Sequence, residues 1–335
     1  MLNANGKMAE GIVTRTDSDP LLANAALPLR ILYFPLGFPI EVATNSPAVI
    51  EAARESWRRF QFKFALPPLV LQIGVTEDSG DHEIPPAPLC RLQWNLLLNI
   101  ADSRNFVVCN LKEGRSFGWV TRSTAYSTLY LRYHMLEAAG YSMIASLRAA
   151  PLHAACVSLE GRGVLLCGDS GAGKSSLAFA CVRAGWTYTS DDATYVPLNR
   201  DDRIVVGNSH QIRFRVTAAE LFPEIEGRTV TPRAVGKPSI EVPMVELPAL
   251  ATADSASVEY IVFLNRRDVG SPKLLPLAKE RLLQRFIHDL IKTVDSYSAQ
   301  EAAIRRVLEA ETFELRYKDL DWAVERLELL ANSGR

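Results

Sequence analysis

Three kinds of feature are scarce or missing in this 335-residue sequence: paired cysteines, excess charge of one sign and long apolar runs. The five cysteines are scattered and none forms a C-x-x-C pair, so the sequence predicts reduced thiols in a cytoplasmic protein without a disulfide framework or zinc site. A formal net charge of −1 argues against a surface dedicated to nucleic acid or an anionic membrane. No uncharged apolar run approaches the roughly 20 residues that span a bilayer.

The amino terminus lacks the pattern of a secretory signal. Residues 1–24 contain three acidic side chains and no continuous apolar block, and we expect residues 1–27 to form a loose tail. Repeats and low-complexity tracts are also missing. Because 48% of the residues are hydrophobic, most of the remaining chain is expected to fold around apolar cores.

The hydrophobic pattern divides the rest of the chain into two predicted domains. Residues 28–125 fit a small α/β or α+β domain, with a helix that starts at Pro47, and they contain no motif that indicates chemistry. Residues 126–150 are expected to form a connecting helix that is apolar on most sides. Residues 151–335 are predicted to form an α/β domain that ends in helices.

Two strand pairs are predicted in the second domain. Strands 152–159 and 164–167 are expected to form a hairpin around the loop Glu160-Gly161-Arg162-Gly163. Strands 203–206 and 211–216 are expected to pair around a Gly-Asn turn. These pairs matter because polar residues that could carry chemistry lie on or beside them.

The clearest motif begins where the first hairpin ends. It matches G-x-x-x-x-G-K-[ST] in full and lies between an apolar strand and a predicted helix. Backbone N–H groups of such a loop surround phosphate oxygens, and the helix N-terminus adds partial positive charge. A chance glycine-rich turn is the alternative. The motif predicts a nucleoside triphosphate site with Mg²⁺, in which Lys174 reaches the β- and γ-phosphates and Ser175 ligates the metal. The predicted cradle consists of Gly168, Asp169, Ser170, Gly171, Ala172, Gly173, Lys174 and Ser175.

Two carboxylates, Asp191 and Asp192, follow the next predicted strand, 186–190. One short helix links this strand to the loop strand, and a right-handed crossover would make the two strands parallel. Their carboxyl ends then share one sheet edge. Successive strand residues point to opposite sides, so one carboxylate should face the site and the other support it. A carboxylate there can hold Mg²⁺, the role considered for Asp191, or accept a hydroxyl proton, although a polar strand end is the alternative.

His153 is a candidate because of hairpin counting. If Leu159 pairs with Val164, Cys156 pairs with Cys167 and His153 falls opposite Ser170. The imidazole would then lie beside the phosphate loop, where it could bind phosphate or orient Asp192. A structural histidine is the alternative.

Basic residues on a later strand are further candidates. Gln211, Arg213 and Arg215 alternate with apolar residues and therefore share the polar face of a strand. Arg213 could neutralise charge on a transferring phosphoryl group, and Lys237 is a weaker candidate of the same kind. A solvated face is the alternative.

Other nucleotide-binding classes fit less well. Asn265-Arg266-Arg267-Asp268 is similar to the guanine-reading N-K-x-D pattern but lacks its lysine, and no D-x-x-G switch follows Asp192. We interpret it as a short surface turn. The sequence has no H-R-D or D-F-G set, which excludes a eukaryotic-type protein kinase.

Taken together, His153, the loop sequence G-D-S-G-A-G-K-S and the Asp191-Asp192 pair resemble the C-terminal domain of bacterial HPr kinase/phosphorylase. The resemblance covers about residues 150–217. It implies an α/β P-loop kinase domain of the HPr kinase and phosphoenolpyruvate carboxykinase-like type, and ATP-dependent phosphorylation of a serine hydroxyl. By position, Asp192 would accept the proton with His153 and Lys174 as partners, and Ser175 would bind Mg²⁺.

The sequence also departs from that family. The family's E-[IL]-R-G-L-G-I segment, which contributes a Mg²⁺-binding glutamate, corresponds here to Gln211-Ile212-Arg213-Phe214. The family links this segment to the dephosphorylating reaction, which is therefore doubtful here. The family's later active-site arginine has no clear match in this sequence.

Three functions remain open at this level. The leading hypothesis is a serine kinase acting on a protein or precursor peptide, with ATP and Mg²⁺ and with neither nucleic acid nor membrane as partner. The others are a small-molecule kinase on the same scaffold and a non-catalytic nucleotide sensor, which Gln211 in place of an acid keeps open. HPr kinases assemble as rings, so the resemblance also implies a homo-oligomer.

Overall fold

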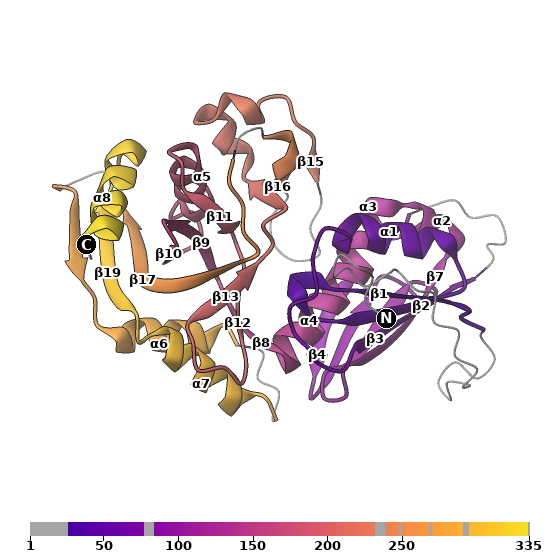
Figure 1. Ribbon diagram of the computed structural model, residues 1–335. Helices are drawn as coiled ribbons and strands as arrows, with labels where there is room; N and C mark the ends of the chain where they lie inside the picture. Colours follow the sequence, from indigo (N-terminus) through magenta and orange to yellow (C-terminus); the bar gives the residue numbers. More distant parts are fainter. Residues whose placement is uncertain are drawn as a thin grey trace, which may run out of the picture. The chain divides into compact units, whose positions relative to one another are not determined.

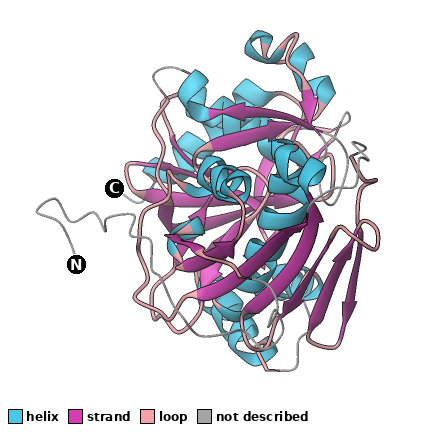
Figure 2. Cartoon of the chain, turned by 90° about the vertical axis from the view of Figure 1, so that its right-hand side faces the viewer, coloured by secondary structure: helices cyan, strands magenta, loops and turns pink. Residues whose placement is uncertain are grey.

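The computed structural model describes residues 26–76, 84–231, 239–247, 250–267, 270–290 and 295–333. The chain divides into two compact units (Figure 1). The first comprises Met1–Arg148, Pro232–Lys237 and Thr293–Asp295, and the second comprises Ala149–Thr231, Pro238–Lys292 and Ser296–Arg335. Most of the expected tail, residues 1–25, lies outside the described residues, as does Lys237. Both units contain strands and helices, so the protein is a mixed α/β protein with several sheets (Figure 2).

The first unit is built on a seven-stranded sheet with the order β1-β2-β3-β7-β6-β5-β4. Helix α1 begins at Pro47, whose missing N–H costs nothing in the first turn, and it buries Trp57 completely. The elements are β1 (Leu29–Tyr33), β2 (Ile40–Thr44), α1 (Pro47–Trp57), β3 (Leu69–Thr76), β4 (Leu89–Gln93), β5 (Leu96–Ile100), β6 (Phe106–Asn110), β7 (Arg115–Thr121), α2 (Arg122–Tyr126), α3 (Thr128–Tyr130), a π-helix (Leu131–Glu137) and α4 (Ala138–Leu147).

The segment predicted as one connecting helix over residues 126–150 is less regular than expected. It passes through α3, the π-helix and α4, and its helical part ends at Leu147 because the next residues enter strand β8 (Ala149–Leu152). Every residue of the π-helix is buried. Its one arginine, Arg132, forms ion pairs with Glu55 and Glu137 at 2.6 and 3.3 Å, which compensate for the burial of its charge.

The second unit contains a nine-stranded sheet, with a path β11-β9-β10-β17-β13-β12-β8 and with β19 joined to β17 and β18, and a three-stranded sheet, β14-β16-β15. Its strands are β8 (Ala149–Leu152), β9 (Ala154–Leu159), β10 (Arg162–Gly168), β11 (Thr187–Ser190), β12 (Thr194–Pro197), β13 (Ile204–Gly207), β14 (Gln211–Phe214), β15 (Val230–Thr231), β16 (Ser239–Pro243), β17 (Ser255–Arg266), β18 (Lys273–Pro276) and β19 (Glu311–Tyr317). Its helices are α5 (Lys174–Arg183), α6 (Lys279–His288), α7 (Tyr297–Val307) and α8 (Leu320–Asn332).

The central strand β10 is apolar on both faces, and this composition produces three layers. Val164 and Leu166 pack into a core with residues of α5 and α8, whereas Leu165 and Cys167 pack into a second core with residues of α6 and α7. Successive strand residues point to opposite faces, so a continuous apolar run needs cover on both sides. Figure 1 shows α5 and α8 on one side of this sheet and α6 and α7 on the other.

The hairpin between β9 and β10 is tighter than predicted. Leu159 pairs with Arg162 and Ala154 with Cys167, so only Glu160 and Gly161 form the turn. Both have positive φ, +49° and +84°, the geometry of the two-residue turn that matches strand twist. The predicted four-residue loop, with Leu159 opposite Val164, is therefore wrong by two residues. The observed register ends at Ala154 opposite Cys167, so counting on by one residue gives Gly168, and not Ser170, as the position level with His153.

The second predicted strand pair is also wrong, because its members belong to different sheets. Strand β13 pairs with β12 and β17, whereas β14 pairs with β16. The chain turns away after Gly207, whose N–H donates to the Asp254 carbonyl, and the Ser209 hydroxyl bonds to the carboxylate of the same residue. These two anchors direct β14 out of the large sheet.

The strand directions place several chain segments at one sheet edge. Strand β10 is parallel to β17, and β17 is parallel to β19. Strands β10 and β11 are both antiparallel to β9 and therefore run in the same direction. This confirms the predicted shared direction, although β9 lies between the two strands. The residues that follow β10, β11, β17 and β19 consequently emerge at a common edge, the usual location of ligand sites in α/β sheets.

Candidate active site

The glycine-rich loop connects the end of β10 at Gly168 to the start of α5 at Lys174. Gly173 precedes the helix with φ +94°, a conformation that side chains rarely adopt. A Cβ on Gly173 would lie 2.6 Å from the Tyr317 hydroxyl, which itself donates to the Ala172 carbonyl at 2.8 Å. The glycine thus allows β19 to approach and hold the loop from outside. The N-terminal amides of a ten-residue helix then begin where the loop ends.

Two cations bind carbonyl oxygens at the start of this loop. The Lys174 ammonium donates to the Gly168 carbonyl at 3.1 Å and to the Asp169 carbonyl at 3.4 Å, and Lys174 is buried. Arg285, from α6, donates to the same Gly168 carbonyl at 2.9 Å and to the Asp169 carboxylate at 2.7 Å. Burial lowers the pKa of Lys174, and Asp192 partly opposes this effect. The loop is therefore framed by positive charge contributed by the protein itself.

Asp192 and His153 form a pair next to the loop. Asp192 Oδ1 lies 3.5 Å from His153 Nδ1, and both side chains are partly exposed. The pKa of His153 is lowered by burial and by the Lys174 ammonium, while the Asp192 carboxylate acts in the opposite direction. The electrostatic influence of Lys174 on His153, and of Asp192 on Lys174, shows that the three side chains share one neighbourhood. The sequence predicts this grouping, and the structure brings the three residues together.

Asp191 points to a different partner. It is 8% exposed, and its Oδ2 accepts the backbone N–H of Arg213 at 2.7 Å. The contact ties the end of β11 to β14, so one aspartate faces His153 while its neighbour supports the strand. One oxygen of the carboxylate is engaged by this amide. The prediction that Asp191 ligates Mg²⁺ stays a prediction.

The Arg213 guanidinium is engaged by a carboxylate of a neighbouring strand. It pairs with Glu241 of β16 at 2.9 Å, and both side chains are largely buried. With its amide oriented to satisfy its neighbours, Gln211 donates to Glu241 at 3.2 Å and accepts from Arg213 at 3.0 Å. Arg215, which follows the same strand, contacts the loop by donating to the Ser170 hydroxyl at 2.8 Å. The role of Arg213 at the phosphoryl group stays a prediction, and Arg215 joins it as a candidate.

Arg285 is the residue that sequence reasoning missed. It lies 117 residues beyond Gly168 in the chain, and the packing of α6 against the sheet brings it to the loop. Its guanidinium lies over the Phe263 ring at 5.6 Å, as does that of Arg281 one turn earlier. The sequence signal for this residue was the i, i+4 spacing of Arg281 and Arg285 on a strongly amphipathic segment. The same spacing is equally typical of a solvent-exposed helix face.

Ser175 and the carboxylates after β11 are oxygen donors near the loop that could contribute to a metal site. Among the described residues, no cluster of three or more His, Cys, Asp or Glu side chains could hold a metal by itself. Mg²⁺ in phosphoryl-transfer sites keeps several waters and takes only one or two protein ligands beside the phosphates. Ser175 in the first turn of α5 and the carboxylates after β11 fit that requirement.

Across the described part of the chain, no helix has both the length and the apolar composition needed to cross a bilayer.

The site thus belongs to a mixed α/β protein that carries a glycine-rich loop, a lysine and a carboxylate–histidine pair at one sheet edge. Residues 146–218 match the family model described as HPr Serine kinase C-terminal domain. This confirms the resemblance to HPr kinase for that segment. The match spans β8 to β14 and includes the loop, His153 and both aspartates.

Individual relatives match only part of the chain. The chain is 44% identical over 61 residues to HPr kinase/phosphorylase from two strains of Limosilactobacillus reuteri, which covers 18% of this chain and 19% of each relative. The chain therefore spans about a fifth of the length of these curated relatives. Among solved structures, the Hpr(Ser) kinase/phosphatase from Coxiella burnetii matches with a TM-score of 0.32 and 15% identity, covering 55% of this chain and 95% of that chain.

Proposed function

We propose that the protein is an ATP-dependent serine kinase of the HPr-kinase-related type, which transfers the γ-phosphoryl group to a hydroxyl on a protein or precursor peptide. The observation that carries this proposal is the Asp192–His153 pair, 3.5 Å apart, in the electrostatic neighbourhood of Lys174. A loop and lysine alone would suit any nucleotide-binding protein. A carboxylate beside them supplies the one further group that transfer to a hydroxyl requires, a proton acceptor.

In the proposed reaction, the serine oxygen forms a bond to the γ-phosphorus while the bond from that phosphorus to the β,γ-bridging oxygen breaks. The hydroxyl proton passes to Asp192, and the electron pair of the broken bond stays on ADP. Lys174 moves from the loop carbonyls to the phosphates and neutralises developing charge. His153, whose pKa is lowered by burial and by Lys174, is neutral near pH 7 and orients the Asp192 carboxylate.

Mg²⁺, when bound with the nucleotide, would neutralise phosphate charge, with Ser175 and Asp191 as candidate protein ligands. Gln211 stands where the family has an acid, and its amide is engaged by Glu241 and Arg213. We therefore propose that the forward reaction dominates and that dephosphorylation is weak or missing.

The proposal is tested by incubating the full chain with γ-labelled ATP and Mg²⁺ in the presence of serine-containing peptides, small proteins and a metabolite mixture. Label on serine of a macromolecule is the expected result. Label confined to a small molecule would favour a small-molecule kinase, and nucleotide binding without turnover on any acceptor would favour a sensor. Either result would contradict the proposed function.

Replacing Arg285 should weaken nucleotide binding. Arg285→Ala removes both hydrogen bonds to the loop, and because bonds to charged groups contribute about 1.5–3 kcal/mol, we expect the affinity for MgATP to fall by about tenfold or more. Isothermal titration calorimetry measures this directly. Arg281→Ala is the matched control, since Arg281 lies over the same Phe263 ring. Equal affinities for the two variants would show that Arg285 does not organise the loop.

A further inference from the structure

Arg215 contacts the middle of the glycine-rich loop. Its Nη2 donates to the Ser170 hydroxyl at 2.8 Å, and both residues are exposed. Across the residues that the structure describes, no carboxylate forms an ion pair with this guanidinium. A permanent positive charge is therefore held at the loop by a neutral oxygen.

Two other arginines near the loop are engaged by carboxylates. Arg213 pairs with Glu241 at 2.9 Å, and both side chains are largely buried. Arg285 pairs with Asp169 at 2.7 Å. Bonds of this kind offset the charge of each guanidinium before any ligand arrives. Of these three arginines, Arg215 is the one whose charge remains for an incoming anion.

The backbone on either side of Arg215 is fixed to the helix that follows the loop. Phe214 and Phe222 flank it in the chain, and their ring centroids lie 5.1 and 4.9 Å from that of Phe179 in α5. All three rings are buried, and rings that meet edge to face stabilise such a cluster. The guanidinium is therefore the part of Arg215 that can change partner while its backbone keeps its place.

A second contact places β14 beside the proposed proton acceptor. The Asp191 carboxylate, just beyond the end of β11, accepts the Arg213 N–H at 2.7 Å, and the next residue is Asp192. In the proposed reaction, the γ-phosphoryl group must lie between the loop and Asp192. Arg215 contacts the loop and follows the strand that is tied to the end of β11, so it lies at the phosphoryl end of the nucleotide site.

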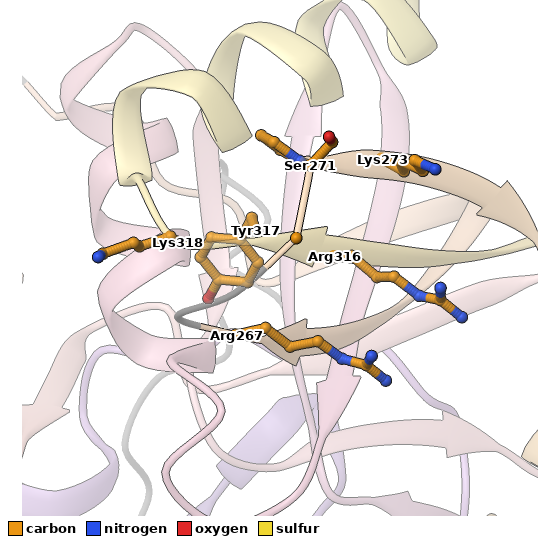
Figure 3. Close-up of a pocket in the computed structure, with 8 residues that line it drawn as sticks. Arg267, Ser271, Lys273, Arg316, Tyr317 and Lys318 are labelled. Atoms are coloured by element: carbon orange, nitrogen blue, oxygen red, sulfur yellow. The ribbon is translucent and has the colours of Figure 1, made fainter.

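The loop itself is held by other contacts, so its conformation does not depend on Arg215. Tyr317, at the end of β19 (Figure 3), donates to the Ala172 carbonyl at 2.8 Å. Lys174 donates to the Gly168 carbonyl at 3.1 Å. Both contacts engage the backbone of the loop, whereas Arg215 engages a side-chain hydroxyl and can leave it without releasing the loop.

We propose that Arg215 leaves the Ser170 hydroxyl when ATP binds, donates to the γ-phosphate and thereby distinguishes ATP from ADP. The inference rests on the proposed function, because it concerns the same nucleotide site. A guanidinium presents several N–H donors in a planar fork that matches phosphate oxygens, and its bond to an anion is stronger than its bond to a neutral hydroxyl. By the correspondence of residues 211–214 with the family's E-[IL]-R-G, Arg215 stands where the family's segment has leucine, so the family's motif does not supply this contact.

The test compares the affinities of the full chain for MgATP and MgADP by isothermal titration calorimetry. Arg215→Gln should lower the affinity for MgATP by about tenfold, the loss expected for one bond between charged groups, and should leave the affinity for MgADP unchanged, which also shows that the variant is folded. Arg183→Gln is the matched control, because Arg183 lies over the Phe222 ring at 5.9 Å and pairs with Glu224 at the far end of α5; it should change neither affinity. Equal losses for the two nucleotides, or no loss for MgATP, would overturn the proposal.

A second variant tests whether the charge of Arg215 is what recognises the phosphate. Arg215→Lys keeps a positive charge and should lose less of the preference for ATP than Arg215→Gln does. Equal losses in the two variants would overturn the proposal, because a role in shape alone would affect both alike. Calorimetry needs no phosphate acceptor, so a preference for ATP that depends on Arg215, together with no transfer to any acceptor, would contradict the proposed kinase function alone.

Discussion

Lys174→Ala should reduce phosphoryl transfer by about a thousandfold, the scale of losing one charged group that stabilises the transition state. The lysine is buried and its ammonium lies against the Gly168 and Asp169 carbonyls, so it is fixed at the loop before ATP arrives. A buried ammonium next to developing phosphate charge acts without the screening that surface charges experience. Initial rates with labelled ATP measure the loss, and calorimetry measures the accompanying fall in MgATP affinity.

The control for this change is Lys279→Ala. Lys279 begins α6 and donates to the Glu309 carbonyl on the surface of the same unit, so its loss removes an equal charge outside the loop contacts. Arg285 still donates to the Gly168 carbonyl when Lys174 is replaced, and we therefore expect the variant to fold, which circular dichroism can check. Transfer within tenfold of the wild type in Lys174→Ala would contradict the proposed role of the loop.

Local patterns predict the centre of the site because its parts lie close together in the chain. The loop, the strand before it and the helix after it occupy residues 162–183 without interruption. The Asp191-Asp192 pair follows one crossover later, and a single rule on its handedness gives the direction of β11 correctly. The two aspartates have different partners, as expected, although both lie just beyond the end of β11 at Ser190: Asp192 faces His153, and Asp191 accepts the Arg213 amide.

The wrong predictions concern strand pairing and side-chain partners, which depend on turn geometry and on packing between distant parts of the chain. Counting across the β9–β10 hairpin fails by two residues, because Glu160-Gly161 adopts a two-residue turn with positive φ and a longer loop would fit the composition equally well. His153 nevertheless reaches Asp192, because it directly precedes β9 while Asp192 shortly follows β11, and these two strands pair antiparallel. The alternation of Arg213 and Arg215 does not tell which arginine Glu241 neutralises, because Glu241 lies on a strand 28 residues away.

Asp192→Asn should reduce the rate of phosphoryl transfer by about 10²–10⁴-fold, the usual contribution of a positioned general base, while leaving MgATP affinity close to that of the wild type. The amide keeps the shape of the carboxylate but cannot accept the serine proton. Because Asp192 raises the pKa of His153, removing its charge should lower that pKa further. Single-turnover rates measure the first effect, and an NMR titration of the imidazole measures the second.

Asp191→Asn and Asp201→Asn complete the comparison. Asp191 accepts the Arg213 amide through Oδ2, and asparagine can still accept that bond, so this variant should retain most of the rate at saturating Mg²⁺ and change mainly the Mg²⁺ concentration required. Asp201 is exposed on the same unit, and its replacement should have no effect. If Asp192→Asn shifts the pKa of His153 but keeps the full transfer rate, the pair exists but Asp192 is not the base. If the rate falls without a shift in that pKa, the base does not lie beside His153. Only the combined loss of rate and lowering of the pKa agrees with a carboxylate that His153 positions and that accepts the proton.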